Sequence, residues 1–190
     1  MRKINTSPEA PAEARAVLEF WFVETEPPSW FKKNPDFDET VRNRFAEVYR
    51  RAATGALEEW RDTPLGCLAL IIVLDQFPRN MFRGDPRSFA TDAAARDVLR
   101  HALEKEFDVG LSTTQKQFLY LPLQHSEEAA DQALSVALNA ATGDPDLVKW
   151  ADAHKRIIDR FGRFPHRNEI LGRATTAEEA EFLAKPGSSF

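Results

Sequence analysis

No stretch of the chain alternates apolar and polar residues with the period of two that a half-buried strand shows. Apolar residues recur instead at helical spacing, as in Phe37, Val41, Phe45, Val48 and Ala52. Ala and Leu total 43 residues while Val and Ile total 15, and β-branched residues are the ones that sheets favour. We therefore predict an all-α fold of roughly eight helices.

The 190 residues have the length of one ordinary domain. We expect residues 1–190 to form a single all-α domain in which residues 185–190 are a loose tail. Caps, prolines and glycines set the predicted helix limits. Helices are predicted from Ser7–Pro8, over 36–53, from Thr63–Pro64 to a stop or kink before Pro78, over 91–107, from 113 to a break at Pro122, over 126–142, over 144–162, and from a capping box at Thr176–Glu179.

Charge and cysteine content exclude several classes of protein. The net charge of −5 argues against binding nucleic acid by bulk attraction. The one cysteine, Cys67, excludes an internal disulfide and lies in an apolar stretch, Leu65–Leu74, of about half the length of a membrane span. The first residues contain no apolar segment of the signal-peptide kind. We therefore expect a cytoplasmic protein that does not interact with a membrane.

The common cofactor and catalytic motifs are absent from the sequence. It contains no phosphate-binding loop, no dinucleotide-binding glycine motif, no nucleophile elbow and no H-E-x-x-H zinc motif. A metal site would have to combine His125, Glu128, His154, His166 and Asp75, and no spacing among them favours one. We expect neither a cofactor nor a metal.

The first unusual segment is LDQFPRNMFRGDPRSFATD, residues 74–92. Asp75 ends a very apolar helix, where a carboxylate opposes the helix dipole and is partly desolvated, so it needs a partner such as arginine. One interpretation is a structural ion pair that fixes the following loop, predicted at 78–90. The other is an acid that lines a pocket or orients its arginine. Arg79 and Arg83 are candidate ligand-binding residues, although their aliphatic stems could simply cover apolar surface.

The second segment is YLPLQHSEEAADQ, residues 120–132. His125 and Glu128 are three residues apart, which on a helix would place both on one face as an acid–base pair. His125 nevertheless precedes Ser126, the expected helix cap, and glutamates suit a helix N-terminus without any catalytic role. Gln132 follows Glu128 by one turn and could extend a polar face toward a pocket.

The third segment is WADAHKRIIDRFGRFPHRNEILGR, residues 150–173. His154 falls on the apolar face of its helix, where a hydrogen-bonded core residue is the alternative to a ligand-binding one. Arg160, Arg163 and Arg167 outnumber the local acids Asp159 and Glu169. These arginines either reach water and acids elsewhere or form an anion site, since the guanidinium fork matches carboxylate and phosphate. His166 lies among them and could titrate near neutral pH.

These segments resemble those of the bacterial domain of unknown function 924 family. The resemblance rests on LALIIVLDQFPRNMFRGDPRSFATD, FLYLPLQHSEE and HKRIIDRFGRFPHRNEILGR, with LEFWF and TTAEEAEFL near the two ends, so it covers almost the whole chain. It implies a tetratricopeptide-like arrangement of stacked helix pairs with one concave face. The chain lacks the 34-residue tetratricopeptide pattern, so the implied similarity is architectural. It implies no reaction.

Three hypotheses about function follow from these segments. The first is a binding module in which the Phe-Pro-Arg strings at 76–84 and 161–173 converge on a cleft for an anionic small molecule or the acidic end of a peptide. The second is an enzyme acting on an anionic substrate, with His125 or His166 as acid–base and Asp75 or Glu128 orienting it. The third is a hub of structural ion pairs without a ligand. The sequence leaves the oligomeric state open.

Overall fold

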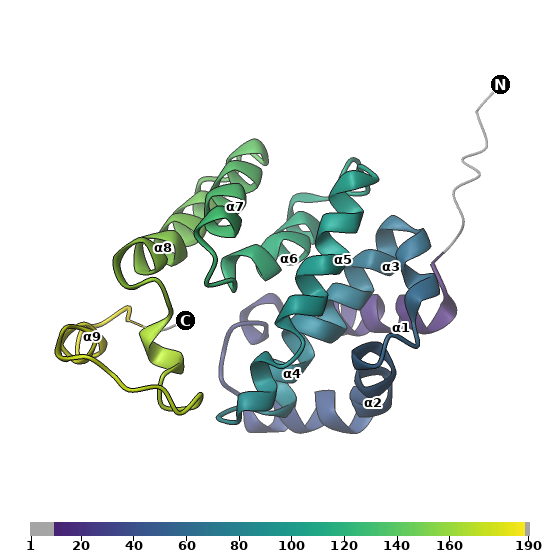
Figure 1. Ribbon diagram of the computed structural model, residues 1–190. Helices are drawn as coiled ribbons and strands as arrows, with labels where there is room; N and C mark the ends of the chain where they lie inside the picture. Colours follow the sequence, from purple (N-terminus) through teal and green to yellow (C-terminus); the bar gives the residue numbers. More distant parts are fainter. Residues whose placement is uncertain (1–9, 189–190) are drawn as a thin grey trace. The chain divides into compact units, whose positions relative to one another are not determined.

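The computed structural model describes residues 10–188, and over this range it is helical with no strand (Figure 1). The predicted all-α fold is confirmed. Short 3-10 and π-helical turns connect the α-helices of this range. They are α1 (Ala12–Glu19), α2 (Pro35–Ala53), α3 (Pro64–Ile71), α4 (Phe77–Met81), α5 (Asp92–Glu104), α6 (Thr113–Gln124), α7 (Ala129–Ala141), α8 (Pro145–Phe161) and α9 (Ala177–Leu183).

Residue contacts cluster in two compact units, which are described separately here. The first unit runs up to Arg83 and continues over Arg87–Pro122, and the second comprises Gly84–Pro86 and the chain from Leu123 onward. The predicted start of a helix at Ser7 lies outside the described residues, as do the last two residues of the predicted tail. In the part of the tail that is described, Ser188 is buried and its hydroxyl donates to the Leu183 carbonyl.

The core of the first unit forms around α3, which packs on both α1 and α5, while α2 packs on α4. Aromatic rings fill the space between these helices. The Phe45 ring lies 4.9 Å from that of Phe20 and 4.8 Å from that of Phe77, and Trp21 meets Phe77 edge-on at 5.8 Å. All four side chains are at least 95% buried, so this aromatic group contributes a large share of the hydrophobic stabilisation.

Pro78 changes the hydrogen-bonding pattern of the long apolar helix, and the sequence indicates only part of this change. α3 ends at Ile71, a π-helical turn follows over Ile72–Gln76, and the N–H of Phe77 bonds to the carbonyl of Ile72. Proline has no N–H and its ring crowds the preceding turn, so the ladder widens there. The prediction of an irregular loop over 78–90 is wrong for the first residues of that range. They belong to a new helix, α4, whose first turn accommodates Pro78.

Two other predicted limits are corrected by the structure. Pro122 does not break its helix but lies in the last turn of α6, where the proline interrupts little of the ladder. Ser126 is not the cap of α7, because Glu128 holds the N-cap position. The Ser126 hydroxyl instead accepts from the Glu128 N–H and donates to Asp131, which fixes the approach to the helix.

The second unit is built on α7 packed along α8. As predicted, Asp144 caps α8, and Gly162 ends it in the left-handed conformation at φ 67°. Phe164 packs against the buried residues Ile157 and Ile158 of α8. The tetratricopeptide-like stacking implied by the family resemblance stays a prediction.

Helix α7 has the reverse of the usual polarity. Gln132, Ser135 and Asn139, at helical spacing, have no exposed surface at all, while Ala133 and Ala137 are exposed. Their side-chain N–H groups find acceptors inside the protein, as when Asn139 donates to the Ser135 carbonyl, whereas the amide oxygens of Gln132 and Asn139 are buried without a hydrogen-bond partner. Burial of polar groups is tolerated when they are hydrogen-bonded. Across residues 10–188, no helix is long and apolar enough to cross a membrane.

Candidate functional site

Three of the four histidines lie close together in the second unit, two of them against the ring of Phe164 and the third against His154. His125 follows the end of α6, His154 lies on α8, and His166 lies in the 3-10 turn after Phe164. The ring centroids are 6.2 Å apart for His125 and His154, 5.9 Å for His154 and Phe164, and 5.5 Å for Phe164 and His166. The guanidinium carbon of Arg167 lies 4.6 Å from the centre of the Phe164 ring. We call these five residues the histidine cluster.

His154 is held as a neutral imidazole in the buried face of α8. It is 6% exposed, and its Nδ1 lies 2.8 Å from the Trp150 carbonyl, one turn earlier. A carbonyl only accepts, so Nδ1 carries the proton and Nε2 keeps its lone pair. Burial lowers the pKa of His154 to about 3; the hydrogen bond to the Trp150 carbonyl opposes this shift, and the positive charge of Arg167 adds to it.

His166 is also neutral near neutral pH. Burial lowers its pKa to about 4, and the positive charge of Arg167 adds to this effect, while Glu127 opposes it. The predicted titration of His166 near neutral pH is therefore wrong. The local sequence, rich in arginine, shows the positive charge but not the burial that comes from packing against Phe164.

Gln132 fixes the turn that carries His125. Its side-chain Nε2 lies 3.1, 2.8 and 2.7 Å from the carbonyl oxygens of Leu123, Gln124 and Ser126. The carbonyls at the end of a helix have no partner within the helix, so this amide serves as a cap for α6. Gln132 lies fully buried, where it holds the backbone on both sides of His125.

Two arginine–carboxylate pairs surround the Phe164 segment. Glu127 accepts hydrogen bonds from Arg173 at 2.7 Å and from the Phe164 N–H at 2.8 Å. Burial would raise the pKa of Glu127, yet these bonds keep it below its ordinary value. Glu179 accepts the fork of Arg163 at 2.7 and 2.8 Å, and these bonds, with the Thr176 N–H, lower its pKa to about 2.

Sequence reasoning gave neither Glu127 nor Glu179 a role at this site. Glu179 was predicted only as part of a capping box, which the structure confirms: it accepts from the Thr176 N–H and its own N–H bonds to the Thr176 hydroxyl. The double role of this glutamate, cap and arginine partner, depends on a contact sixteen residues away along the chain. Glu128, in contrast, is exposed and not helical with His125, so the two do not share a helix face.

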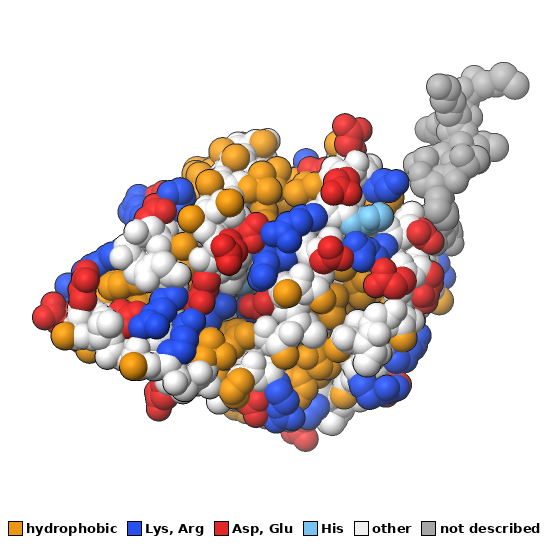
Figure 2. All heavy atoms as spheres, viewed as in Figure 1, with side chains coloured by type: hydrophobic (Ala, Val, Ile, Leu, Met, Phe, Trp, Pro, Cys, Tyr) orange, Lys and Arg blue, Asp and Glu red, His pale blue; other side chains and the backbone are white. Residues whose placement is uncertain are grey.

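The other candidate arginines hold carboxylates. Arg79 contacts Asp92 at 2.8 Å and the fully buried Asp75 at 3.3 Å, and the fork of Arg83 meets Asp38 at 2.7 Å. Arg160 pairs with Glu178 at 2.8 Å on the surface of the second unit. On the face shown in Figure 2, acidic and basic side chains are interspersed. For Arg79, Arg83 and Arg160 these pairs support the structural interpretation.

The profile described as "Bacterial protein of unknown function (DUF924)" matches residues 17–187. The chain belongs to this family. A solved structure of a protein of unknown function from Agrobacterium tumefaciens is similar to it, with 39% identity and a TM-score of 0.87, over 91% of this chain and 97% of the other. No protein with a curated description matches the chain.

For this DUF924 protein, the chemistry has to be argued from the histidine cluster itself. Within residues 10–188, no group of three or more His, Cys, Asp or Glu is arranged to hold a metal ion. The positive charge of Arg167 beside the imidazoles would also repel a cation. What the arrangement offers is imidazole N–H groups and a guanidinium on an apolar wall. The hypothesis that both arginine segments share one cavity stays a prediction.

Proposed function

We propose that the histidine cluster binds an anion, namely the acidic end of a small molecule or of a peptide, in the cytoplasm. The observation that carries the proposal is the convergence of His154, His166 and Arg167 on one ring, Phe164, with His125 next to His154. The imidazole of His166 can donate a hydrogen bond, whereas the single N–H of neutral His154 already donates to the Trp150 carbonyl. The guanidinium of Arg167 adds charge and a fork that fits carboxylate or phosphate. The apolar ring beside them lowers the local dielectric and strengthens such contacts.

The pKa values of the cluster support a positive potential. The charge of Arg167 contributes to the lowered pKa of both His154 and His166. An anion placed among them would offset that charge and raise both pKa values. The cluster is thus better suited to hold an anion than to hold a cation or an apolar group.

Acid–base catalysis on an anionic substrate is the less well supported function. A general acid or base works best with a pKa near the working pH, whereas the pKa values of His154 and His166 are about 3 and about 4. Glu128 is exposed and lies at the N-cap of α7, so it does not form the acid–base pair suggested by its spacing from His125. Binding therefore remains the function that the geometry supports best.

The test compares the rise in melting temperature with phosphate, succinate and chloride at equal ionic strength. A ligand that binds the native state stabilises it by mass action, but phosphate also stabilises proteins by exclusion from their surface. Arg167→Met should remove the specific part of the effect. The matched control is Arg156→Met, on the exposed face of α8, which should keep it.

Histidine NMR gives a second measurement on the wild-type protein. Phosphate or succinate should raise the pKa of His166 from about 4, and chloride should not. Equal anion responses in wild type, Arg167→Met and Arg156→Met, together with an unchanged His166 titration, would exclude the anion site and leave a structural cluster.

A further inference from the structure

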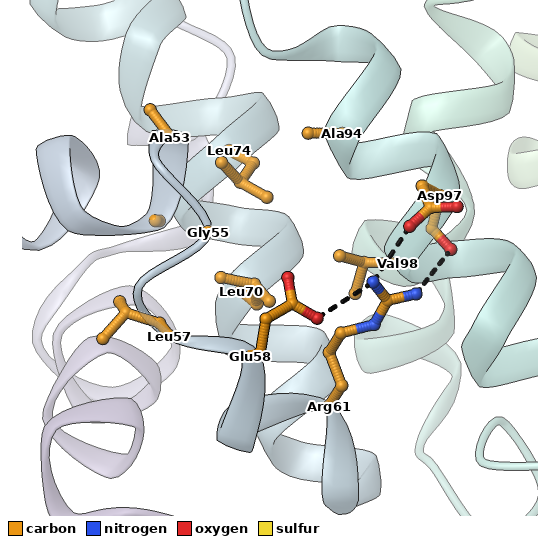
Figure 3. Close-up of a pocket in the computed structure, with 11 residues that line it drawn as sticks. Ala53, Gly55, Leu57, Glu58, Arg61, Leu70, Leu74, Ala94, Asp97 and Val98 are labelled. Carbon is orange, nitrogen blue, oxygen red and sulfur yellow. Dashed lines mark hydrogen bonds and ion pairs between the residues drawn. The ribbon is translucent and has the colours of Figure 1, made fainter.

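The first unit contains a small apolar cavity of about 100 Å³ (Figure 3). Leu57, Leu70, Leu74 and Val98 line it, and none of them is more than 3% exposed. Small residues line the rest of the cavity and leave the space unfilled; they are Ala52, Ala53, Gly55 and Ala94, of which all but Ala52 are exposed, so the cavity opens to solvent on this side. The residues come from the end of α2, from α3 with the π-helical turn that follows it, and from α5, so they belong to one unit.

Charged side chains lie across the rim of this cavity. Arg61 lies 3.2 Å from the carboxylate of Glu58 and 2.9 Å from that of Asp97, as Figure 3 shows. Both carboxylates are exposed, at 64% and 65%, whereas the Arg61 side chain is 20% exposed. Ion pairs with such exposed partners contribute little to stability, about 0–1 kcal/mol, so either carboxylate can accept another cation.

A second, open hollow of about 460 Å³ adjoins the rim and shares Glu58 and Arg61 with the cavity. Its other lining residues are Glu59, Asp62 and His101. Along the two hollows, carboxylates outnumber the single guanidinium by four to one. The C-terminal end of α2 also lies here, at Ala53, and the negative end of its dipole favours a cation.

The backbone under the rim is fixed from several sides. The 3-10 turn Glu58–Asp62 carries Arg61, whose carbonyl accepts from His101 at 3.0 Å. Gly66 allows this turn to lie directly on α3, because a Cβ at that position would be 2.0 Å from the Trp60 carbonyl oxygen. The cavity and its acidic rim are therefore held in a set geometry rather than formed by a loose loop.

We propose that this cavity binds a short linear aliphatic amine. The alkyl chain would lie among Leu70, Leu74 and Val98, and the ammonium group would lie at the rim between Glu58 and Asp97. A cavity of about 150 Å³ holds the six carbons of benzene, so the space of about 100 Å³ here holds about four carbons of an unbranched chain, with the carbon next to the ammonium group at the rim. The excess of carboxylates selects ammonium over carboxylate at the same end of the chain. This site is independent of the histidine cluster.

The test is a titration of the full chain with n-pentylammonium, pentanoate and 1-pentanol, followed by backbone amide NMR. We expect n-pentylammonium to shift the amides of Gly55, Val98 and His101, with at least tenfold weaker binding of pentanol and no binding of pentanoate. The three probes share one chain length, so their difference isolates the head group.

Variants test the carboxylates of the rim and the apolar cavity separately. Glu58→Gln with Asp97→Asn should weaken n-pentylammonium at least tenfold and leave pentanol unchanged. Ala94→Leu should abolish the binding of both by filling the cavity. Glu47→Gln, an exposed glutamate of α2 that pairs with Arg50, is the matched charge control and should bind like wild type. Equal binding of pentanoate and n-pentylammonium, or unchanged binding in Ala94→Leu, would overturn the proposal.

Discussion

Two segments with nearly the same string, QFPRNMFRG at 76–84 and RFPHRN at 163–168, use their arginines differently. In both, the Phe-Pro pair is buried, as predicted, and it fastens the segment to the core of its unit. In the first, Arg79 and Arg83 each bind carboxylates of low exposure. In the second, Arg163 likewise binds the nearly buried Glu179, whereas Arg167 lies against Phe164 beside histidines that burial, with a smaller contribution from its charge, keeps neutral.

The comparison shows that the shared sequence determines how the Phe-Pro pair anchors each segment in the core, but not which groups its arginines contact. Phe and Pro decide where the segment packs, because their burial contributes the hydrophobic free energy. The partners of the arginines come from other elements, such as Asp92 of α5 and Asp38 of α2. The ion pairs of Arg79 and Arg83 support a structural role for the first segment. The histidines beside Arg167 make the second segment the candidate binding site.

The largest effect should come from Asp75→Ala in the first segment. Asp75 is fully buried beside Arg79, and removing one partner of a buried pair costs on the order of 3–5 kcal/mol. Urea denaturation measures the loss in the free energy of unfolding. Asp159→Ala, which breaks an exposed pair with Lys155, should cost less than about 1 kcal/mol. Equal losses in the two variants would show that Asp75 is not part of a buried ion pair.

The next effect concerns pH and the second segment. The pKa values of His154 and His166 are lowered in the folded state from 6.5 to about 3 and about 4. The unfolded chain therefore binds protons first as the pH falls, and stability decreases from about pH 6.5 downward. The slope per histidine is about 1.4 kcal/mol for each pH unit. His166→Gln should remove one part of this slope between pH 6.5 and pH 4, and denaturation at several pH values checks it.

A smaller effect is expected for Arg83 of the first segment. Its fork donates to both oxygens of Asp38 at 2.7 Å. Arg83→Met should cost about 1.5–3 kcal/mol, the usual worth of hydrogen bonds to a charged group. Arg83→Lys keeps the charge but loses the fork, so it should cost about half as much. If thermal denaturation shows that Arg83→Lys is as stable as the wild type, the bidentate geometry contributes nothing to stability.

The smallest effect is expected for Arg160 of the second unit. Both partners of its pair with Glu178 are exposed, at 47% and 61%. Arg160→Ala should therefore change the free energy of unfolding by less than about 1 kcal/mol, and it should leave the anion response of the histidine cluster unchanged. A lost anion response in this variant would extend the proposed site to the surface arginines.

Local patterns predicted most of the fold. Helical spacing gave the all-α class, and the caps at Thr63, Asp144 and Thr176 hold as predicted. The effect of the prolines was harder to predict from the sequence, because it depends on where each proline lies in a helix. Pro122 is tolerated in the last turn of α6, and Pro78 begins a helix after a π-helical turn.

The candidate site was predictable in part. The buried position of His154 follows from the apolar face of its helix. Asp75 was expected to be buried and paired with an arginine outside its own helix, and it is fully buried beside Arg79, four residues further along the chain in α4. The contact of His125 with His154 joins residues 29 positions apart, which no local pattern contains, whereas His166 lies only two positions from Phe164. Glu127 was equally hidden, because it reaches Phe164 and Arg173 across 37 and 46 positions.

The reversed polarity of α7 changes what a mutational scan of this helix would find. Apolar residues are the usual occupants of the buried face of a helix, but here the inward positions are Gln132, Ser135 and Asn139. A library of single variants should tolerate polar replacements at Ala133 and Ala137 and reject apolar ones at the inward positions. Selection in such a library should therefore retain hydrogen-bonding side chains, rather than apolar ones, at the inward positions. A redesign that placed apolar residues there on hydropathy alone would unfold the helix.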